Sequence, residues 1–225
     1  MTKHPSDESR PVWNVGDREV IFIRLANIYK QRLASDVEAE PVLENEHPIS
    51  PSDISSDGRT LVFREHKDGK RAIRLYDFET GEARDYLRVD GRVTQSRLSP
   101  DNRWIAYNSD ATGRDEVYVE SFPERGERFQ VSATGGGQPI WRGDGRELYY
   151  YKYDSGEMMA VPIDMDADAN PIGKPVAPFK TNLRNDDYDV SKDGQRFLLN
   201  RRLDRAPVHS LVLIQNWTAG LTPAQ

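Results

Sequence analysis

Leu98-Ser99-Pro100-Asp101-Asn102-Arg103-Trp104-Ile105-Ala106-Tyr107 is a ten-residue pattern that recurs, with variations, at four other places in the chain. The related stretches read WNVGDREVIF (13–22), ISSDGRTLVF (54–63), WRGDGRELYY (141–150) and VSKDGQRFLL (190–199). Their first residues are 41, 44, 43 and 49 positions apart. The chain therefore carries an internal repeat, and its period is typical of stacked supersecondary units.

The first half of the pattern predicts a tight turn. In Ser99-Pro100-Asp101-Asn102, proline sets φ at the second position, and asparagine tolerates a left-handed backbone at the fourth. An aspartate at this place bonds its own backbone, so the recurring aspartates are expected to serve the turn and not a reaction. The residues assigned to the structural repeat are Trp13, Asp57, Gly58, Asp101, Asn102, Trp141, Asp144, Gly145, Asp193 and Gly194.

The second half predicts a short strand buried on both faces, because Trp104–Tyr107 and its counterparts are apolar and rich in β-formers. Each repeat offers about four such strands, and the alternation in residues 116–122 has a period of two. No convincing helix is visible. The expected units are 9–45, 46–90, 91–134, 135–184 and 185–217, with 218–225 as a tail, all in one domain spanning 1–225.

Composition narrows the class of protein. The net charge is −6 and no segment carries a sustained Lys/Arg stripe, which argues against nucleic-acid binding. The chain has no cysteine, so disulfides and thiolate metal sites are excluded. No run reaches the ~20 apolar residues of a membrane span, and Met1–Arg10 lacks the apolar core of a signal peptide. As written, the chain is expected to be cytoplasmic, although a parent protein in the periplasm or outside the cytoplasm stays open.

Units of about 43 residues, each with four short strands, are typical of β-propeller blades, which bury both faces by radial stacking. The recurring turn followed by an apolar strand resembles the TolB-like β-propeller repeat over residues 10–217. Residues 99–122, 138–141, 158–162, 188–191 and 216–217 resemble the closing blades of propellers that follow bacterial serine/threonine kinase domains. The kinase signatures themselves are absent.

The count of blades leaves two alternatives. Relatives of this kind usually close with six or more blades, whereas five are legible here and the last lacks a fourth strand. Either residues before Trp13 complete the last blade of a five-bladed ring, or the chain is part of a larger ring. An unclosed ring exposes blade edges and faces, which favours self-association.

The resemblance implies that inter-blade loops, together with loops between second and third strands, emerge on one face around the channel. This face is predicted to be a docking surface for a protein or peptide, and its mixed charge suits such a partner. The residues assigned to binding on this face are His47, His66, Arg92, Asp110, Arg114, Gln138 and Asp186, and the same face also collects Asp154 and Arg202.

Other motifs are interpreted as structural. Residues 164–170 have the alternating acids of a calcium loop but lack its glycine and glutamate, so a solvated loop is favoured. Arg142-Gly143-Asp144 lies inside the repeated turn, and the glycines at 135–137 are interpreted as a flexible linkage between blades. The four histidines lack ligand spacing, so neither a metal nor a cofactor is predicted.

The sequence therefore predicts a non-catalytic TolB-like propeller that binds a protein or peptide. Two enzymatic alternatives remain open. One is a propeller glycosidase, for which Asp53, Asp187 and Asp189 are the carboxylates to test. The other is the substrate-gating propeller of a prolyl-oligopeptidase-like peptidase whose catalytic domain, with its Gly-x-Ser-x-Gly elbow, is absent from this chain.

Overall fold

Five antiparallel sheets make up the computed structural model, which describes residues 6–16, 18–33, 37–167, 170–201 and 210–215. No helix occurs in these ranges, so the prediction of an all-β propeller is confirmed. The described residues accordingly contain no helix that could cross a membrane. The predicted tail, 218–225, lies outside the described residues.

Each sheet is formed by strands that are consecutive in the chain. The first sheet contains β1 (Glu8–Trp13), β2 (Glu19–Arg24), β3 (Asn27–Arg32) and β4 (Glu40–Leu43), and the second contains β5 (Ile49–Ile54), β6 (Thr60–Lys67), β7 (Lys70–Asp77) and β8 (Ala83–Val89). The third contains β9 (Val93–Leu98), β10 (Trp104–Ser109), β11 (Glu116–Ser121) and β12 (Arg128–Gln130). The fourth contains β13 (Gly137–Trp141), β14 (Glu147–Lys152), β15 (Glu157–Pro162) and β16 (Val176–Lys180), and the fifth β17 (Leu183–Val190), β18 (Arg196–Arg201) and β19 (Ser210–Gln215).

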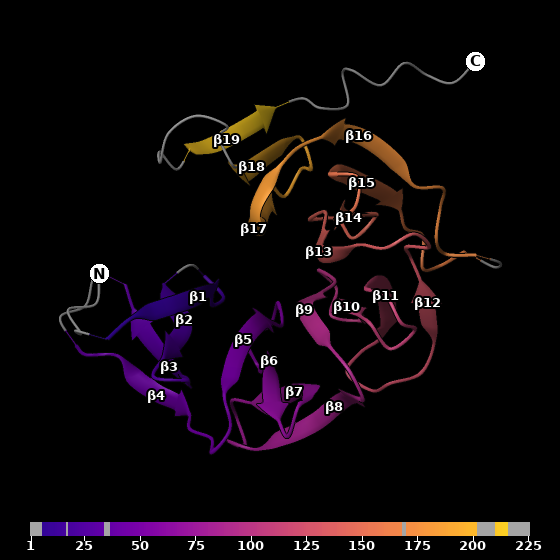
Figure 1. Ribbon diagram of the computed structural model, residues 1–225. Helices are drawn as coiled ribbons and strands as arrows, with labels where there is room; N and C mark the ends of the chain where they lie inside the picture. The colour runs from indigo at the N-terminus through magenta and orange to yellow at the C-terminus, as the bar shows by residue number, and fades with distance from the viewer. Residues whose placement is uncertain (1–5, 17, 34–36, 168–169, 202–209, 216–225) are drawn as a thin grey trace, which may run out of the picture.

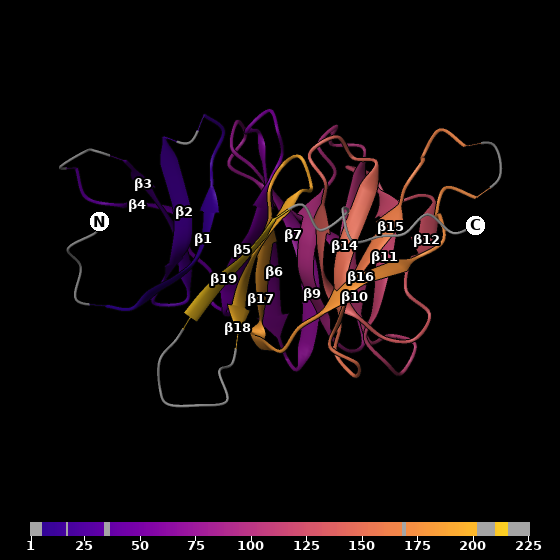
Figure 2. The same ribbon diagram turned by 90° about the horizontal axis from the view of Figure 1, so that it is seen from above.

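The sheets stand radially about a common axis (Figure 1), and a view turned by 90° shows them side by side (Figure 2). Their first strands are innermost, and contacts run from β1 to β5, β9, β13 and β17 in turn. The ring is open between the first and fifth sheets (Figure 1). Residues 8–13 form the inner strand of the first blade, so they do not complete the last one as one alternative had predicted, and β17-β18-β19 has three described strands.

The repeated turn has the structure that its residues predict. Asn102 has a φ of 57°, and Gly58, Gly145 and Gly194 have φ values of 73°, 74° and 71°, so this position requires the left-handed backbone that glycine and asparagine accept. Asp101 accepts hydrogen bonds from Ser99 Oγ at 2.6 Å and from the backbone N–H of Arg103 at 3.1 Å. Asp57, Asp144 and Asp193 accept the corresponding backbone bond. The aspartates are turn residues.

Turns of adjacent blades also bind one another. Asn102 donates its side-chain amide to Ser56 Oγ at 2.8 Å and accepts from the Ser56 backbone N–H at 2.9 Å. Gly143 donates its N–H to the carbonyl of Lys192 at 2.9 Å. The turns therefore connect neighbouring sheets at one end of the molecule.

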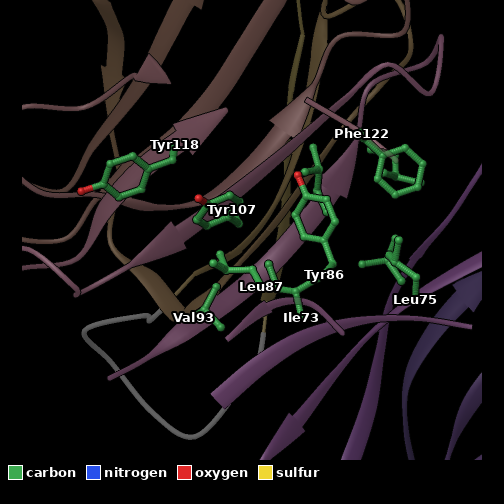
Figure 3. Packing of buried hydrophobic residues seen from close by; sticks show 11 residues of the cluster. Ile73, Leu75, Tyr86, Leu87, Val93, Tyr107, Tyr118 and Phe122 are labelled. Carbon is green, nitrogen blue, oxygen red and sulfur yellow. The ribbon is translucent and has the colours of Figure 1, made fainter. Parts of the chain in front are cut away.

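The apolar core consists of clusters between neighbouring sheets. In the best-defined cluster, Ile73, Tyr86 and Leu87 from the second sheet pack against Val93 and Tyr107 from the third (Figure 3). Similar clusters lie between the other adjacent pairs of sheets. The strand residues 61–63, 105–107 and 148–150 are buried, as the sequence predicts for strands covered on both faces.

The two faces beside the opening have no such cover. Trp13 is 57% exposed, whereas its repeat equivalents Ile54, Leu98 and Trp141 are 9%, 7% and 9% exposed. Leu198 is 42% exposed, although the four residues equivalent to it are fully buried; these are Ile21, Val62, Ala106 and Tyr149. Positions that the repeat makes apolar for packing therefore face outward at the opening.

The turn carboxylates make stability depend on pH. Burial raises the pKa of Asp101, but hydrogen bonds from Ser99 and Arg103 outweigh it and hold the pKa below its ordinary value. A lowered pKa in the folded state stabilises the fold above pH ~4, and this stabilisation disappears as the pH falls through the folded pKa. Asp101→Asn should lower the free energy of unfolding at pH 7 by about 1 kcal/mol.

The measurement is urea unfolding of wild type and Asp101→Asn between pH 7 and pH 3. The difference between the two proteins should shrink below pH ~4, as protonation removes the carboxylate from the wild type. Ser99→Ala is the matched control because it removes one partner while the carboxylate remains. A constant difference across the range would contradict the turn role of Asp101.

Candidate functional site

The inner strands of all five blades surround one cavity on the axis of the ring. Its volume is about 180 Å³. Each blade contributes lining residues from its first strand, and β6 adds Arg64. The full lining is Arg10, Pro11, Val12, Pro51, Ser52, Arg64, Gln95, Arg97, Gln138, Pro139, Ile140, Asp187 and Tyr188.

The repeat explains why these residues meet. The position three residues before the first residue of each ten-residue pattern lines the cavity in every blade. These equivalent residues are Arg10, Pro51, Gln95, Gln138 and Asp187. The fold therefore brings the five equivalent residues together at one cavity. Their residue types differ from blade to blade.

The backbone is irregular at this position. Arg10, Gln95 and Gln138 have φ values of 54°, 45° and 60°, and each inner strand shifts its register against the second strand of its sheet here. A left-handed conformation is unfavourable for residues other than glycine, by roughly 1–3 kcal/mol. Bulges of this kind redirect side chains, and here they occur where the strands meet the cavity.

Arg64 is the most unusual lining residue. Its Nη2 donates to Ser50 Oγ at 3.2 Å, whereas its buried Nε has no hydrogen-bond partner among the described residues. Burial, together with the positive charges of Arg10, Arg71 and Arg97, lowers the pKa of Arg64 to about 10. In the described part of the chain no carboxylate forms an ion pair with this guanidinium.

Arg97 lines the cavity, and its charge interacts with that of Asp53, which does not line it. Arg97 donates to the backbone carbonyl of Ser52. Asp53 accepts from the backbone N–H groups of Leu98 at 2.8 Å and Ile54 at 2.9 Å. Burial raises the pKa of Asp53, while Arg97 and the two backbone bonds oppose this rise. Asp53 is therefore engaged in joining the second and third blades.

A neutral group beside these charges is also unsatisfied. Ser52 is 5% exposed and lines the cavity, and its Oγ has no hydrogen-bond partner within the described ranges. Buried hydroxyl groups are ordinarily hydrogen-bonded. Ser52 and Arg64 thus each contain a buried polar atom without a partner, and both residues line the same cavity.

The predicted loop face is occupied by internal ion pairs. Arg92 contacts Asp110 at 3.0 Å and Asp115 at 2.6 Å. Arg114 contacts Glu116 at 2.8 Å, and these two residues line a second cavity with Thr112, Gly113, Gln130 and Ala133. These charges therefore hold local structure, and their binding role stays a prediction.

Two of the predicted loop residues lie in strands. Gln138 is in β13 and Asp186 is in β17, because the bulged inner strands begin before the apolar pattern does. The structure places Gln138 on the cavity, while the side chain of Asp186 lies outside the description. His66 is exposed at the end of β6 and His47 is half-buried before β5, so these histidines do not line the cavity. Arg202 is outside the described residues.

The glycines between the third and fourth blades do not form the predicted flexible linkage. All three, 135–137, are buried. A Cβ at Gly136 would lie 2.6 Å from the Tyr150 ring, and one at Gly137 would overlap the Tyr153 hydroxyl. Close packing therefore requires glycine at these two positions.

The remaining motifs agree with structural roles. Arg142 pairs with Asp144 at 2.7 Å within the turn. Asp164 accepts the backbone N–H of Asp166 at 3.3 Å, and Asp189 accepts that of Val190 at 2.8 Å. The described residues contain no group of three or more histidine, aspartate or glutamate side chains that could hold a metal.

Sequence reasoning missed Arg10, Arg64 and Arg97 as site residues. The available signal was departure from the repeat, since the residues equivalent to Arg64 are Ile23, Asn108, Tyr151 and Asn200. Arg97 likewise replaces aliphatic or acidic residues at its position. Comparison of equivalent positions would have indicated that these arginines are not needed by every blade.

The state of Arg64 leads to a stability prediction. Arg64→Met should raise the free energy of unfolding by about 1 kcal/mol, because it removes a buried charge that has no ion-pair partner. Arg74→Met is the matched control on the next strand, where Arg74 contacts Glu65 at 3.0 Å and Asp85 at 2.9 Å. In Arg74→Met the free energy of unfolding should fall by about 2 kcal/mol. Urea unfolding at pH 7 distinguishes the two, and a comparable loss in both would show that Arg64 is a structural residue.

Comparisons with known proteins agree with the propeller fold. No family model matches the chain. An uncharacterized protein of Agrobacterium fabrum, Atu1656, is 28% identical over 113 residues, which are 50% of this chain and 38% of that protein. The chain thus spans less than half of this curated relative.

Solved structures cover nearly all of the chain at low identity. TolB from Acinetobacter baumannii matches 94% of this chain and 52% of its own, with a TM-score of 0.75 and 18% identity. An oligogalacturonate lyase in complex with manganese matches 98% of this chain and 65% of its own, with a TM-score of 0.69 and 15% identity. A gluconolactonase from Xanthomonas campestris matches 89% of this chain and 71% of its own, with a TM-score of 0.64 and 14% identity. The chain therefore has the fold of TolB-like β-propellers, a fold that both enzymes and non-enzymes use.

Proposed function

We propose that this propeller is a non-catalytic module that binds a protein or peptide partner at the mouth of its central channel. The observation that carries the proposal is the convergence of arginine, glutamine and serine residues from different blades on one cavity. Arg64 Nε and Ser52 Oγ have no partner in the described structure, and both residues line the cavity. A peptide offers backbone carbonyl groups and side-chain acceptors that match such donors.

The two glutamines strengthen this proposal. Gln95 and Gln138 line the cavity from the third and fourth blades, and both have a left-handed backbone. No hydrogen bond of either side-chain amide occurs within the described structure. An amide can donate and accept simultaneously, which suits a peptide group. Backbone strain at such residues is typical of binding sites.

The enzymatic alternative has weaker support from the site. The carboxylates of Asp53 and Asp189 accept backbone hydrogen bonds, so they stabilise inner strands. Asp187 lines the cavity and is the carboxylate that a glycosidase would have available. Hydrolysis of a polysaccharide, or cleavage of oligogalacturonate, that is lost in Asp187→Asn or Asp189→Asn would favour an enzyme over a binding module.

We also propose a setting for the module, and the sequence resemblance supports it. A propeller similar to those joined to bacterial serine/threonine kinases would act as a sensing or docking domain for its neighbour in the chain. The coding sequence around this chain is the test of that setting, because a kinase, a peptidase or further repeats would each be recognisable there.

Peptide binding at the channel gives a direct prediction. Peptides selected from a random phage-displayed library should bind the immobilised chain, and Gln95→Asn with Gln138→Asn should weaken them about tenfold. Asparagine keeps the left-handed backbone but is shorter, so the amides withdraw from the cavity. Fluorescence polarisation of a labelled peptide measures the affinity.

The control is Arg59→Gln, because Arg59 is an exposed turn residue of the second blade that does not line the cavity. It should leave the affinity unchanged. A library that yields no binding peptide, or an equal loss in the control, would contradict docking at the channel.

The open ring generates a prediction of self-association. Trp13 is 57% exposed and Leu198 is 42% exposed on the two faces beside the opening, so a second copy can bury them. Sedimentation velocity should show a dimer that increases with concentration, and Trp13→Glu should shift the protein to monomer. Exposed Lys174→Glu is the control for added charge. A wild type that stays monomeric at high concentration would exclude this contact.

A further inference from the structure

Three arginines of the channel come from three different repeat positions. Arg10 is three residues before its pattern, Arg97 is one residue before, and Arg64 is ten residues after the first residue of its pattern. All three line the same cavity. The repeat requires none of these arginines. Their convergence is therefore a feature of this cavity and not of the repeated fold.

The fold does not pair the charges of these arginines as it pairs those of neighbouring arginines. On the strand of Arg64, the neighbouring Glu65 is contacted by Arg74 at 3.0 Å and by Arg88 at 3.1 Å. No comparable ion pair of Arg10, Arg64 or Arg97 occurs in the described structure. Arg64, whose Nε is buried, therefore lacks the carboxylate that normally compensates burial, whereas Arg10 is exposed and the charge of Arg97 interacts with Asp53.

Of the acids near the cavity, Asp53 interacts electrostatically with Arg97, and none among the described residues forms an ion pair with Arg64. Asp53 bonds the backbone of Ile54 and Leu98, and Asp189 bonds that of Val190. Asp187 lines the same cavity but is exposed, and no ion pair between it and these arginines occurs among the described residues. The wall around Arg64 is left positive, and like charges lower the pKa of that residue.

We infer that Arg10, Arg64 and Arg97 bind the carboxylate of an aspartate- or glutamate-bearing peptide segment inserted into the channel. Guanidinium groups match carboxylates in geometry and charge, and all three arginines line the cavity. This inference rests on the proposed function, which supplies the peptide partner. It adds the requirement that the peptide carry an aspartate or glutamate side chain.

The size of the cavity favours a peptide over a free anion. A volume of about 180 Å³ exceeds the ~30 Å³ share of one water molecule several-fold. A carboxylate alone would leave most of this space unfilled. The amides of Gln95 and Gln138 on the same wall can hold the adjoining peptide groups.

The experiment measures binding of the intact chain to labelled hexaglutamate at constant ionic strength, with hexaglutamine as the neutral peptide. Inorganic phosphate and oligogalacturonate are competitors that represent a free anion and an acidic sugar. Arg64→Gln and Arg97→Gln should each weaken hexaglutamate binding roughly 10- to 100-fold, as expected for loss of a charge-assisted hydrogen bond. Arg74→Gln, which alters a paired arginine, should leave the affinity within about twofold.

The outcomes separate this inference from the proposed function. Tight hexaglutamate binding that needs Arg64 and Arg97, with weak binding of hexaglutamine, supports the carboxylate site. Equal binding of the two peptides overturns the inference, while library peptides that still depend on Gln95 and Gln138 would preserve the proposed function. Binding of only phosphate or only oligogalacturonate overturns the assignment to a peptide. Circular dichroism of each variant verifies folding, and an unfolded Arg64→Gln would itself overturn the inference by showing a structural role.

Discussion

Burial of apolar side chains between neighbouring sheets is the constraint on which the rest of this structure depends. A single four-stranded sheet cannot enclose Ile73 or Tyr107, and both become buried only because the second and third blades face each other. The same requirement applies at every contact between adjacent blades. It sets the radial arrangement, and it explains why Trp13 is exposed where no neighbour covers its face.

Radial packing also places one strand of every blade on the axis. The inner strands must come close together, and the bulges at Arg10, Gln95 and Gln138 occur where they do so. The packing between blades leaves the residue type at this position free, since proline, glutamine, arginine and aspartate all occur there. The axis is therefore the part of the molecule where side chains can change without loss of the fold.

The fold was largely predictable because its determinants are local and repeated. Asn102 and the glycines at its equivalent positions indicate the turn, and runs such as 61–63 indicate buried strands. The site was less predictable because it depends on contacts between blades. Gln138 was assigned to a loop, since a bulge hides the start of β13 from a pattern of alternating residues. Arg64 is one of several arginines in its sequence neighbourhood, and only the packed structure shows that it lacks an acidic partner.

The contrast between Arg64 and Glu65 shows how a repeat protein can acquire a site. Glu65 is buried and compensated by Arg74 and Arg88, so its charge serves the blade. Arg64, one residue away, has its Nε buried without a partner and lies beside two further positive charges on the axis. Its uncompensated charge opposes folding, and a repeat that accepts isoleucine, asparagine or tyrosine at this position does not need it. A residue that the fold does not require, at a cavity that every blade helps to form, is better explained by what binds there than by what it stabilises.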